Sequence, residues 1–240
     1  LYVKSSETDQ QGTLLLSDIK PLKLSRGSLE LTKTVNSLEI LEKQVVFGLY
    51  ELPDKPGIAA QIFEELSKAK INVDLIIQAS REKNNNDITF TISEKFLDKT
   101  KEQCDSIISQ IGGKYSITQN MTKLSIQGVG IMGRPSISAE FFDTLSKANI
   151  NVRLIATSEI KVSCVIDLKD IAKAIRFVGD KFKLSSNQIF INPISEKTDK
   201  PEVRGIALDK NQVQVSFRNL PDKPGVAASI CLALAEANLI

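Results

Sequence analysis

A six-residue run, Leu-Pro-Asp-Lys-Pro-Gly, occurs at 52–57 and again at 220–225. Each copy precedes apolar residues at helical spacing, so each is expected to lead into the N-terminus of a helix. The first amides of a helix have no intrahelical acceptor, the helix dipole adds positive charge there, and Gly57 lets a ligand approach the backbone. The carboxylate of a free amino acid suits such a turn. A simpler interpretation, in which Asp54 only caps the helix and Pro-Gly only turns the chain, stays open.

A second group of polar residues follows the first expected helix. Asn72, Val73 and Asp74 come directly after it, and Gln78 ends the strand-like stretch that follows. The side chains of Asn72 and Asp74 could meet an ammonium group, although an ordinary helix-to-strand turn explains them too. Arg153 stands at the position of Asp74 in the second copy, so ligand preference is expected to differ there.

A third candidate group offers two hydroxyls and a carboxylate at the end of another expected strand. It consists of Thr157, Ser158 and Glu159. A plain hairpin turn is an equally good interpretation, because polar residues of this kind are common where two strands join.

The residue inventory argues against catalysis in this chain. It contains no histidine, which removes Ser-His-Asp and Cys-His mechanisms and every imidazole metal site. Cys104, Cys164 and Cys231 are far apart and form no Cys-x-x-Cys pair, so neither a zinc site nor a disulfide framework is expected, and a reducing cytoplasm is favoured. No phosphate-binding glycine loop and no carboxylate set at metal spacing occurs. We therefore expect no catalytic residue, no metal and no cofactor here.

Charge and hydropathy also limit the partners. With 31 Lys and Arg against 29 Asp and Glu, the net charge of the 240-residue chain is only +2. No basic cluster is interleaved with aromatic residues, and no apolar run reaches the roughly 18 residues that span a bilayer. Neither a nucleic acid nor a membrane is expected as a partner.

The sequence repeats itself, which organises the expected elements. Leu-Ser-Lys-Ala at 66–69 and Ile-Asn-Val at 71–73 recur at 145–148 and 150–152, so the chain holds two copies of one module and the start of a third. Each complete module reads as strand, helix, strand, strand, helix, strand, which predicts the α+β, ferredoxin-like arrangement with an antiparallel sheet and helices on one face. The expected strands cover 45–50, 72–78, 87–92, 115–118, 123–129, 152–157 and 161–166, and the expected helices cover 58–69, 96–111, 138–148 and 171–182.

These runs resemble the ACT domain, a small amino-acid-sensing module of metabolic enzymes. The runs at 54–60, 71–74 and 87–91, with Thr-Ser-Glu-Ile-Lys-Val-Ser-Cys at 157–164, make the chain similar to the regulatory region of aspartate kinases. Residues 1–6 and 12–14 resemble the end of that family's catalytic domain. Ser136 departs from the pattern, because the other two turns have glycine there. The restart of the repeat resembles the cyanobacterial type, which carries two pairs of ACT modules.

The resemblance implies a domain plan. Residues 1–36 would end the kinase domain and connect it to the modules. The first ACT module would cover 37–120, with 37–43 lent to the second module at 121–185. A linker at 186–203 and the start of a third module at 204–240 would follow. Because the chain stops within a repeat, we expect it to be a segment of a longer protein.

The resemblance also implies a function. The parent enzyme would use ATP and Mg to phosphorylate aspartate, the first step towards lysine, threonine and methionine. This segment would bind lysine and/or threonine, inhibit the upstream kinase domain and form a homodimer through its ACT modules. A stand-alone amino-acid-binding regulator and a non-sensing dimerisation module remain alternatives. The candidate effector-binding residues are Asp54, Pro56, Gly57, Ile58, Ala59, Asn72, Val73, Asp74, Gln78, Met132, Ser136, Ile137, Asn151, Val152, Thr157, Ser158, Glu159, Asp222, Gly225 and Val226.

Overall fold

The structure is a computed structural model that describes residues 2–3, 13–14, 33–81, 85–134, 136–193, 215, 217 and 220–237. The chain divides into two units, Leu1–Lys33 and Thr34–Ile240. In the first unit, the described residues form two short antiparallel strands, β1 (Tyr2–Val3) and β2 (Thr13–Leu14). Most of the predicted kinase-domain end at 1–36, and the predicted linker beyond residue 193, lie outside the described residues.

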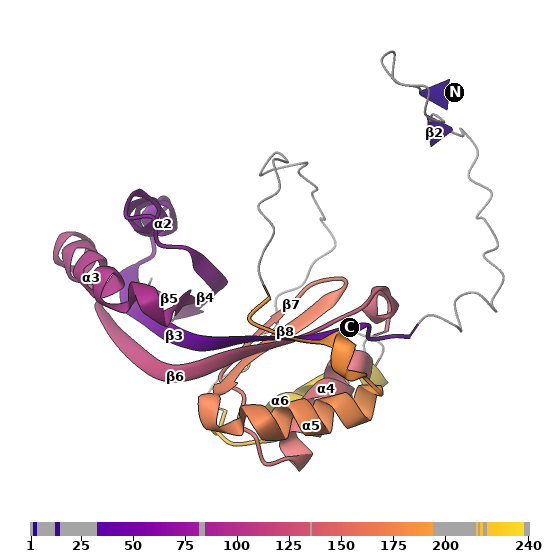
Figure 1. Ribbon diagram of the computed structural model, residues 1–240. Coiled ribbons are helices and arrows are strands. Elements are labelled where there is room, and N and C mark those ends of the chain that lie inside the picture. The colour runs from indigo at the N-terminus through magenta and orange to yellow at the C-terminus, as the bar shows by residue number, and fades with distance from the viewer. Residues whose placement is uncertain are drawn as a thin grey trace. The chain divides into compact units, whose positions relative to one another are not determined.

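Two long strands run through both ACT modules of the second unit (Figure 1). They are β3 (Ser37–Pro53) and β6 (Lys114–Gln127), which pair antiparallel along most of their length. Their register shifts between Leu41 and Val46, where Lys43 and Asn120 adopt positive φ angles of 51° and 58°. Bulges of this kind bend and twist a strand. One pair of strands therefore serves two modules, whereas the sequence analysis placed separate strands at 115–118 and 123–129.

The first module has the predicted strand and helix order. Its core is formed by one face of the sheet and two helices, with Phe47, Phe90, Ile62 and Leu66 fully buried. Ile62 and Leu66 belong to the apolar stripe that predicted the first helix, and such burial stabilises by about 1.5–3 kcal/mol per side chain. Besides the ends of the two long strands, the elements are α2 (Ile58–Lys68), β4 (Val73–Arg81), β5 (Asn85–Ser93), the 3-10 turn η1 (Glu94–Phe96) and α3 (Leu97–Ile111).

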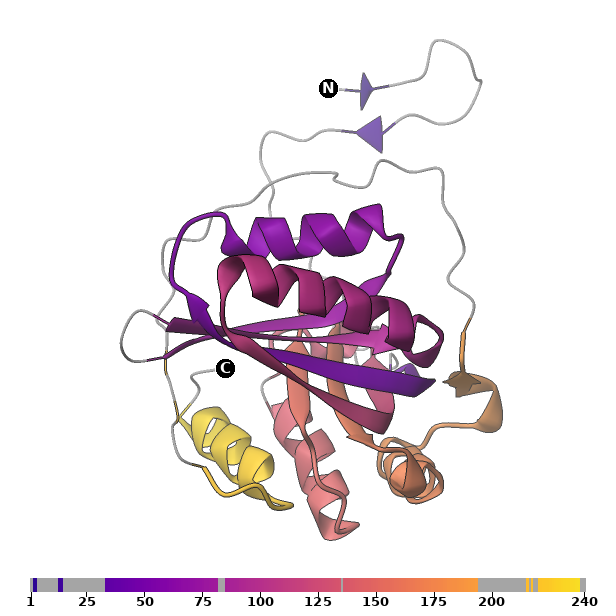
Figure 2. The ribbon, with the colours of Figure 1, turned by 90° about the vertical axis from the view of Figure 1, so that its left-hand side faces the viewer.

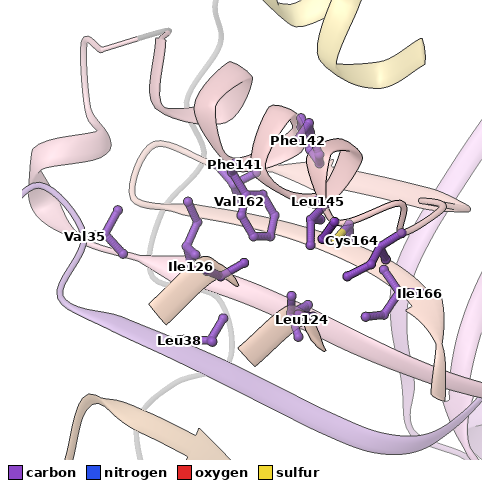
Figure 3. Packing of buried hydrophobic residues seen from close by; sticks show 14 of the residues in the cluster. Val35, Leu38, Leu124, Ile126, Phe141, Phe142, Leu145, Val162, Cys164 and Ile166 are labelled. Carbon is purple, nitrogen blue, oxygen red and sulfur yellow. The ribbon is translucent and has the colours of Figure 1, made fainter. Parts of the chain in front are cut away.

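The second module repeats this order on the other halves of the long strands. Its core contains Phe141, Leu145 and Cys164 together with Leu38 from β3 (Figure 3). The elements are β6, the 3-10 turn η2 (Val129–Ile131), α4 (Ser136–Lys147), β7 (Leu154–Thr157), β8 (Lys161–Asp167), the 3-10 turn η3 (Leu168–Asp170) and α5 (Ile171–Phe182). The stretch Ser37–Leu41 of β3 pairs with β6 beside this core, so it completes the sheet of the second module.

All strands of the two modules form one seven-stranded sheet in the order β4-β5-β3-β6-β8-β7, with β9 beside β3. Figures 1 and 2 show α2 and α3 on one side of the long strands and α4 and α5 on the other. Each module thus keeps both helices on one face of its own sheet, and the tandem ferredoxin-like ACT fold is confirmed.

The stretch predicted as a linker starts with structure. Residues 186–191 form the 3-10 turn η4 (Ser186–Gln188) and strand β9 (Ile189–Ile191), which pairs parallel with Leu38, Glu39 and Ile40 of β3. In a plain ferredoxin-like module the strand after α5 would lie next to β6. Here β3 holds that place, so β9 adds a further edge strand. The prediction of a linker from residue 186 is therefore wrong for 186–191.

The β-branched and apolar run at 72–78 predicts a buried strand, but strand β4 is only half covered. It is the outer strand of the sheet path, Ile76 is 53% exposed, and Gln78 is exposed too. Among the described strands, β4 pairs along one long side only, with β5. The run of β-branched and apolar residues therefore marks a strand that is half covered.

The described part of the third module consists of its turn and its first helix. Helix α6 (Val226–Glu236) packs against α4 of the second module, and Ala228 is buried in the core of that module. The first helix of the third module thus lies beside the first helix of the second.

Candidate ligand-binding sites

The turn before α2 leaves the helix N-terminus open. Gly57 occupies the N-cap position in a left-handed conformation, with φ 95°, and no side chain caps the helix. The interpretation of Asp54 as a helix cap is therefore wrong. A Cβ at Gly57 would have no heavy atom within 4 Å, so its φ angle is what favours glycine here. The Ile58 amide donates to Lys55 O at 3.4 Å, so the amides of Ala59 and Ala60 are the ones that a ligand anion could use.

A cavity of about 300 Å³ lies against this turn. It brings together six predicted residues: Asp54, Pro56, Gly57, Ile58, Ala59 and Gln78. The sequence analysis missed three others that line it: Lys55, Asn86 and Ile88. We call this the first-module pocket.

Asn86 is the polar group that the sequence analysis overlooked in this pocket. Its side chain donates through Nδ2 to Asp54 Oδ1 at 2.6 Å, and the residue is only 7% exposed. Its Oδ1 atom is buried and has no hydrogen-bond partner among the described residues. A buried acceptor that lacks a donor is costly, so this atom is suited to accept from a ligand. The sequence does indicate this position. Side chains alternate along a strand, so Asn86 points to the same face as the buried residues Ile88 and Phe90.

Asn72, Val73 and Asp74 do not lie in the first-module pocket. They line a separate cavity of about 600 Å³, together with Lys43, Gln44 and other residues near the register shift of β3. The Asp74 carboxylate forms an ion pair with the Lys123 ammonium and also accepts from the Leu75 amide at 2.9 Å. The chain's own ammonium thus meets Asp74, where the sequence analysis expected a ligand ammonium.

A second turn pocket forms between the second and third modules. This cavity of about 350 Å³ has mostly apolar walls, which include Phe142, Ile155 and Leu220. Five predicted residues from two modules meet there: Asn151, Val152, Asp222, Gly225 and Val226. Repeat matching identified both stretches but did not indicate that they lie together.

Polar contacts hold the third-module turn against the second module. Asn151 Nδ2 donates to Asp222 Oδ1 at 2.7 Å, and Arg153 Nη1 lies 3.7 Å from Asp222 Oδ2. Arg153 Nε also lies 3.4 Å from Asp167 Oδ1. Asp222 corresponds to Asp54 in the repeat, so the turn aspartate accepts from an asparagine amide in both pockets. Arg153 lines this pocket, whereas Asp74, which corresponds to it in the repeat, does not line the first-module pocket.

The remaining predicted residues line none of these three cavities. Thr157, Ser158 and Glu159 are exposed, and the Ser158 amide donates to Lys161 O at 2.8 Å, as in a hairpin turn. Met132 is exposed on the second-module turn, Ser136 is exposed at the start of α4, and Ile137 is buried in the core.

The described residues offer little for bond-making chemistry. Burial raises the pKa of the Cys104 thiol to about 12, and it also raises the pKa values of Cys164 and Cys231, so these thiols stay protonated at neutral pH. Among the described residues, no group of His, Cys, Asp or Glu side chains is placed to hold a metal ion. In the same part of the chain, no helix is both long and apolar enough to cross a membrane. The two turn pockets combine polar groups with apolar walls, which suits a small dipolar molecule.

Known proteins share both the sequence pattern and the fold. The ACT domain family model matches residues 51–106 and 124–182. The chain is 30% identical to the aspartokinase of Thermus thermophilus over 186 residues, and 32% identical to that of Helicobacter pylori over 184. Each alignment covers 77% of this chain and 44% of the relative, so the chain spans less than half the length of these enzymes.

Solved structures lead to the same family. The aspartate kinase from Synechocystis superposes with a TM-score of 0.79 at 36% identity, covering 86% of this chain and 36% of that one. The ligand-free regulatory subunit of aspartate kinase from Thermus thermophilus superposes with a TM-score of 0.59 at 31% identity, covering 62% of this chain and 99% of that one. The chain therefore belongs to the aspartate kinase family and corresponds to its regulatory region, which is built from ACT domains.

Proposed function

We propose that this chain binds lysine and/or threonine and thereby feedback-inhibits the ATP-dependent phosphorylation of L-aspartate. That reaction is the first step towards lysine, threonine and methionine. One observation supports the proposal: the first-module pocket brings together an uncapped helix N-terminus, Asp54, Gln78 and Asn86, whose buried Oδ1 atom has no partner among the described residues.

The pocket has complementary groups for a free amino acid. The α-carboxylate fits the first amides of α2, where the helix dipole favours an anion. The α-ammonium fits the acceptors that line the same pocket, which are the Asp54 carboxylate and the side-chain oxygens of Gln78 and Asn86. An acceptor that the α-ammonium does not occupy could accept from the threonine hydroxyl or from the lysine ε-ammonium.

Inhibition needs a difference in affinity between two states of the enzyme. An effector shifts the equilibrium only as far as it binds the inhibited arrangement more tightly than the active one. The turn pocket between the second and third modules supports such a difference, because its walls come from two modules and change if those modules move apart.

The rest of the enzyme follows from family membership. We assign the kinase domain, with its ATP and Mg, to a part of the protein upstream of these modules. A homodimer through the ACT modules is supported by β4, whose outer side is an unpaired strand edge with Ile76 exposed. Three cysteines in the thiol form support action in the reducing cytoplasm.

The direct test is an inhibition assay on the full-length protein. Aspartate-dependent ATP turnover should fall when lysine, threonine or both are added, and Asp54→Ala should weaken that inhibition while uninhibited turnover stays near wild type. A protein with no aspartate-dependent turnover that still binds these amino acids would favour the stand-alone regulator. A protein that binds neither would favour the dimerisation module.

A further inference from the structure

The chain enters the ACT modules through the second module, although the first module comes earlier in the sequence. The Asn36 amide donates to Gln127 O of β6 at 2.7 Å, ahead of β3. Val35 is 2% exposed and belongs to the core of the second module, where Figure 3 shows it near Ile126. The entry segment Thr34–Asn36 is therefore fixed to the second module before the chain reaches the first.

Two glycines let the entry segment lie directly on the second-module turn. A Cβ atom at Gly130 would come within 2.5 Å of Thr34 Cα and 3.0 Å of Thr34 O. A Cβ atom at Gly128 would meet Thr34 O and would come within 2.9 Å of Val35 Cα. These obstacles are backbone atoms, which a side-chain rotation cannot move away. Gly128 is extended, with φ 173°, and neither glycine adopts the left-handed conformation that favours glycine, so close approach of the backbone is what requires glycine at both positions.

Side chains and neighbouring loops hold the same segment. Arg134 Nη1 donates to Thr34 Oγ1 at 3.1 Å, and Gln188 Nε2 of η4 donates to Asn36 O at 2.9 Å. The Gly128 amide donates to Ile160 O at 2.9 Å, which ties the hairpin between β7 and β8 to the same turn. The second-module turn and η4 therefore contact the entry segment directly, and the β7–β8 hairpin contacts that turn.

The second-module turn differs from the two turns that line pockets. Gly133 stands where the others have Asp54 and Asp222, and Ser136 stands where they have glycine. The turn lacks the carboxylate acceptor of the other two. Its surface next to Gly128 and Gly130 is covered by the entry segment.

We infer that the second module is the output module of this regulatory region: its turn anchors Thr34–Asn36, and Gly128 and Gly130 are the positioning residues of that anchor. When the second module moves, the anchored segment moves with it, and the movement passes to the residues before Thr34. The inference rests on the proposed function for the statement that an effector drives this movement. The anchor itself rests on the contacts alone.

The first test measures the anchor without any effector. Hydrogen exchange of the peptide that contains Asn36 should be about tenfold faster in Gly130→Ala than in wild type, because the added methyl group displaces Thr34 and weakens the Asn36–Gln127 hydrogen bond. Gly133→Ala is the matched control. Gly133 lies in the same turn, where φ 69° strains an alanine but a Cβ would have no heavy atom within 4 Å, so this variant adds backbone strain without pressing on Thr34. Equal exchange at Asn36 in the two variants would overturn the anchor.

The second test measures output on the full-length enzyme. Gly130→Ala should bind lysine and threonine within about twofold of the wild-type affinity but should need roughly tenfold more effector for half inhibition. Inhibition at wild-type effector concentrations, despite faster exchange at Asn36, would overturn the output role. If wild type binds neither amino acid, the proposed function fails and the output role fails with it, whereas the exchange comparison still decides the anchor.

A milder variant covers the case in which Gly130→Ala does not fold. Thr34→Val removes the hydroxyl that accepts from Arg134 and leaves the backbone contacts in place. Thr34→Val should make hydrogen exchange at Asn36 faster and raise the effector concentration for half inhibition, in both cases by a smaller factor than Gly130→Ala. Wild-type values for both measurements in Thr34→Val would then overturn the inference.

Discussion

Replacing Asp54 by alanine tests whether the first-module pocket is built as described. Asp54 is exposed and its side chain does not cap α2, so its surface position alone predicts a negligible loss of folding stability. The structure predicts a larger loss of stability, because the carboxylate accepts from the buried Asn86 amide, whose Oδ1 atom has no other partner within the described part of the chain. Without it, Asn86 would be 7% exposed with both polar ends unpaired.

The expected cost follows from that burial. A buried amide left without partners costs about 1–3 kcal/mol, compared with about 0.5 kcal/mol or less for an ordinary surface substitution. With a urea m-value of about 2 kcal/mol per M, the unfolding midpoint should fall by roughly 0.5–1.5 M. The stability of a domain is about 5–15 kcal/mol, so Asp54→Ala should still fold.

Two further variants separate this cause from others. Asp222→Ala removes the corresponding carboxylate of the third-module turn, whose partners Asn151 and Arg153 reach solvent, so it should cost less than about 1 kcal/mol. In the background of Asp54→Ala, Asn86→Leu removes the unpaired amide and should recover part of the loss. The assay is equilibrium urea unfolding followed by circular dichroism. Equal costs for Asp54→Ala and Asp222→Ala, or no recovery by Asn86→Leu, would refute the reasoning.

Two other predictions concern charged contacts away from the turn. Asp74→Asn should lower the free energy of unfolding by about 3–5 kcal/mol, because it leaves the Lys123 ammonium, whose side chain is 10% exposed, without its partner. Lys123→Met should cost at least about 1 kcal/mol less, because the carboxylate that it leaves unpaired belongs to Asp74, whose side chain is 37% exposed. Equal losses in urea unfolding would contradict this. A hydrogen bond to Asp105 raises the pKa of Tyr115 to about 12, from 10.0 in a free side chain. Because the folded protein favours the neutral phenol, this contribution to stability is complete below about pH 10 and is lost as the pH rises towards 12. Phenolate absorbance should show Tyr115 titrating at lower pH in Asp105→Asn, and an unchanged titration would count against the bond.

Local patterns predicted the helices well. The apolar stripe predicted α5 at its observed bounds, Ile171–Phe182, and the shared Leu-Ser-Lys-Ala runs predicted both first helices. The repeated helix ends also match in detail, because Lys70 and Asn149 both take positive φ angles after the helix. Such features depend on neighbours within one turn of chain, which a sequence displays directly.

Features that depend on distant contacts were missed. The continuous strands β3 and β6 bend at Lys43 and Asn120, where no glycine or proline marks the bulge. The apolar composition of β4 did not show that its outer side would lack a neighbour. The meeting of Asp222 with Asn151 depends on how α6 docks on α4, which the repeat alone does not specify.

The central claim is that the turn pockets bind an amino-acid effector, and calorimetric titration of this chain with L-threonine and with L-lysine tests it most directly. We predict saturable binding of at least one of them, weakened about tenfold or more by Asp54→Ala, and a higher melting temperature at saturation, where a ligand at about 100 times its Kd stabilises by roughly 2.7 kcal/mol. Absence of binding heat for both amino acids, singly and together, with unchanged melting temperatures, would contradict the account.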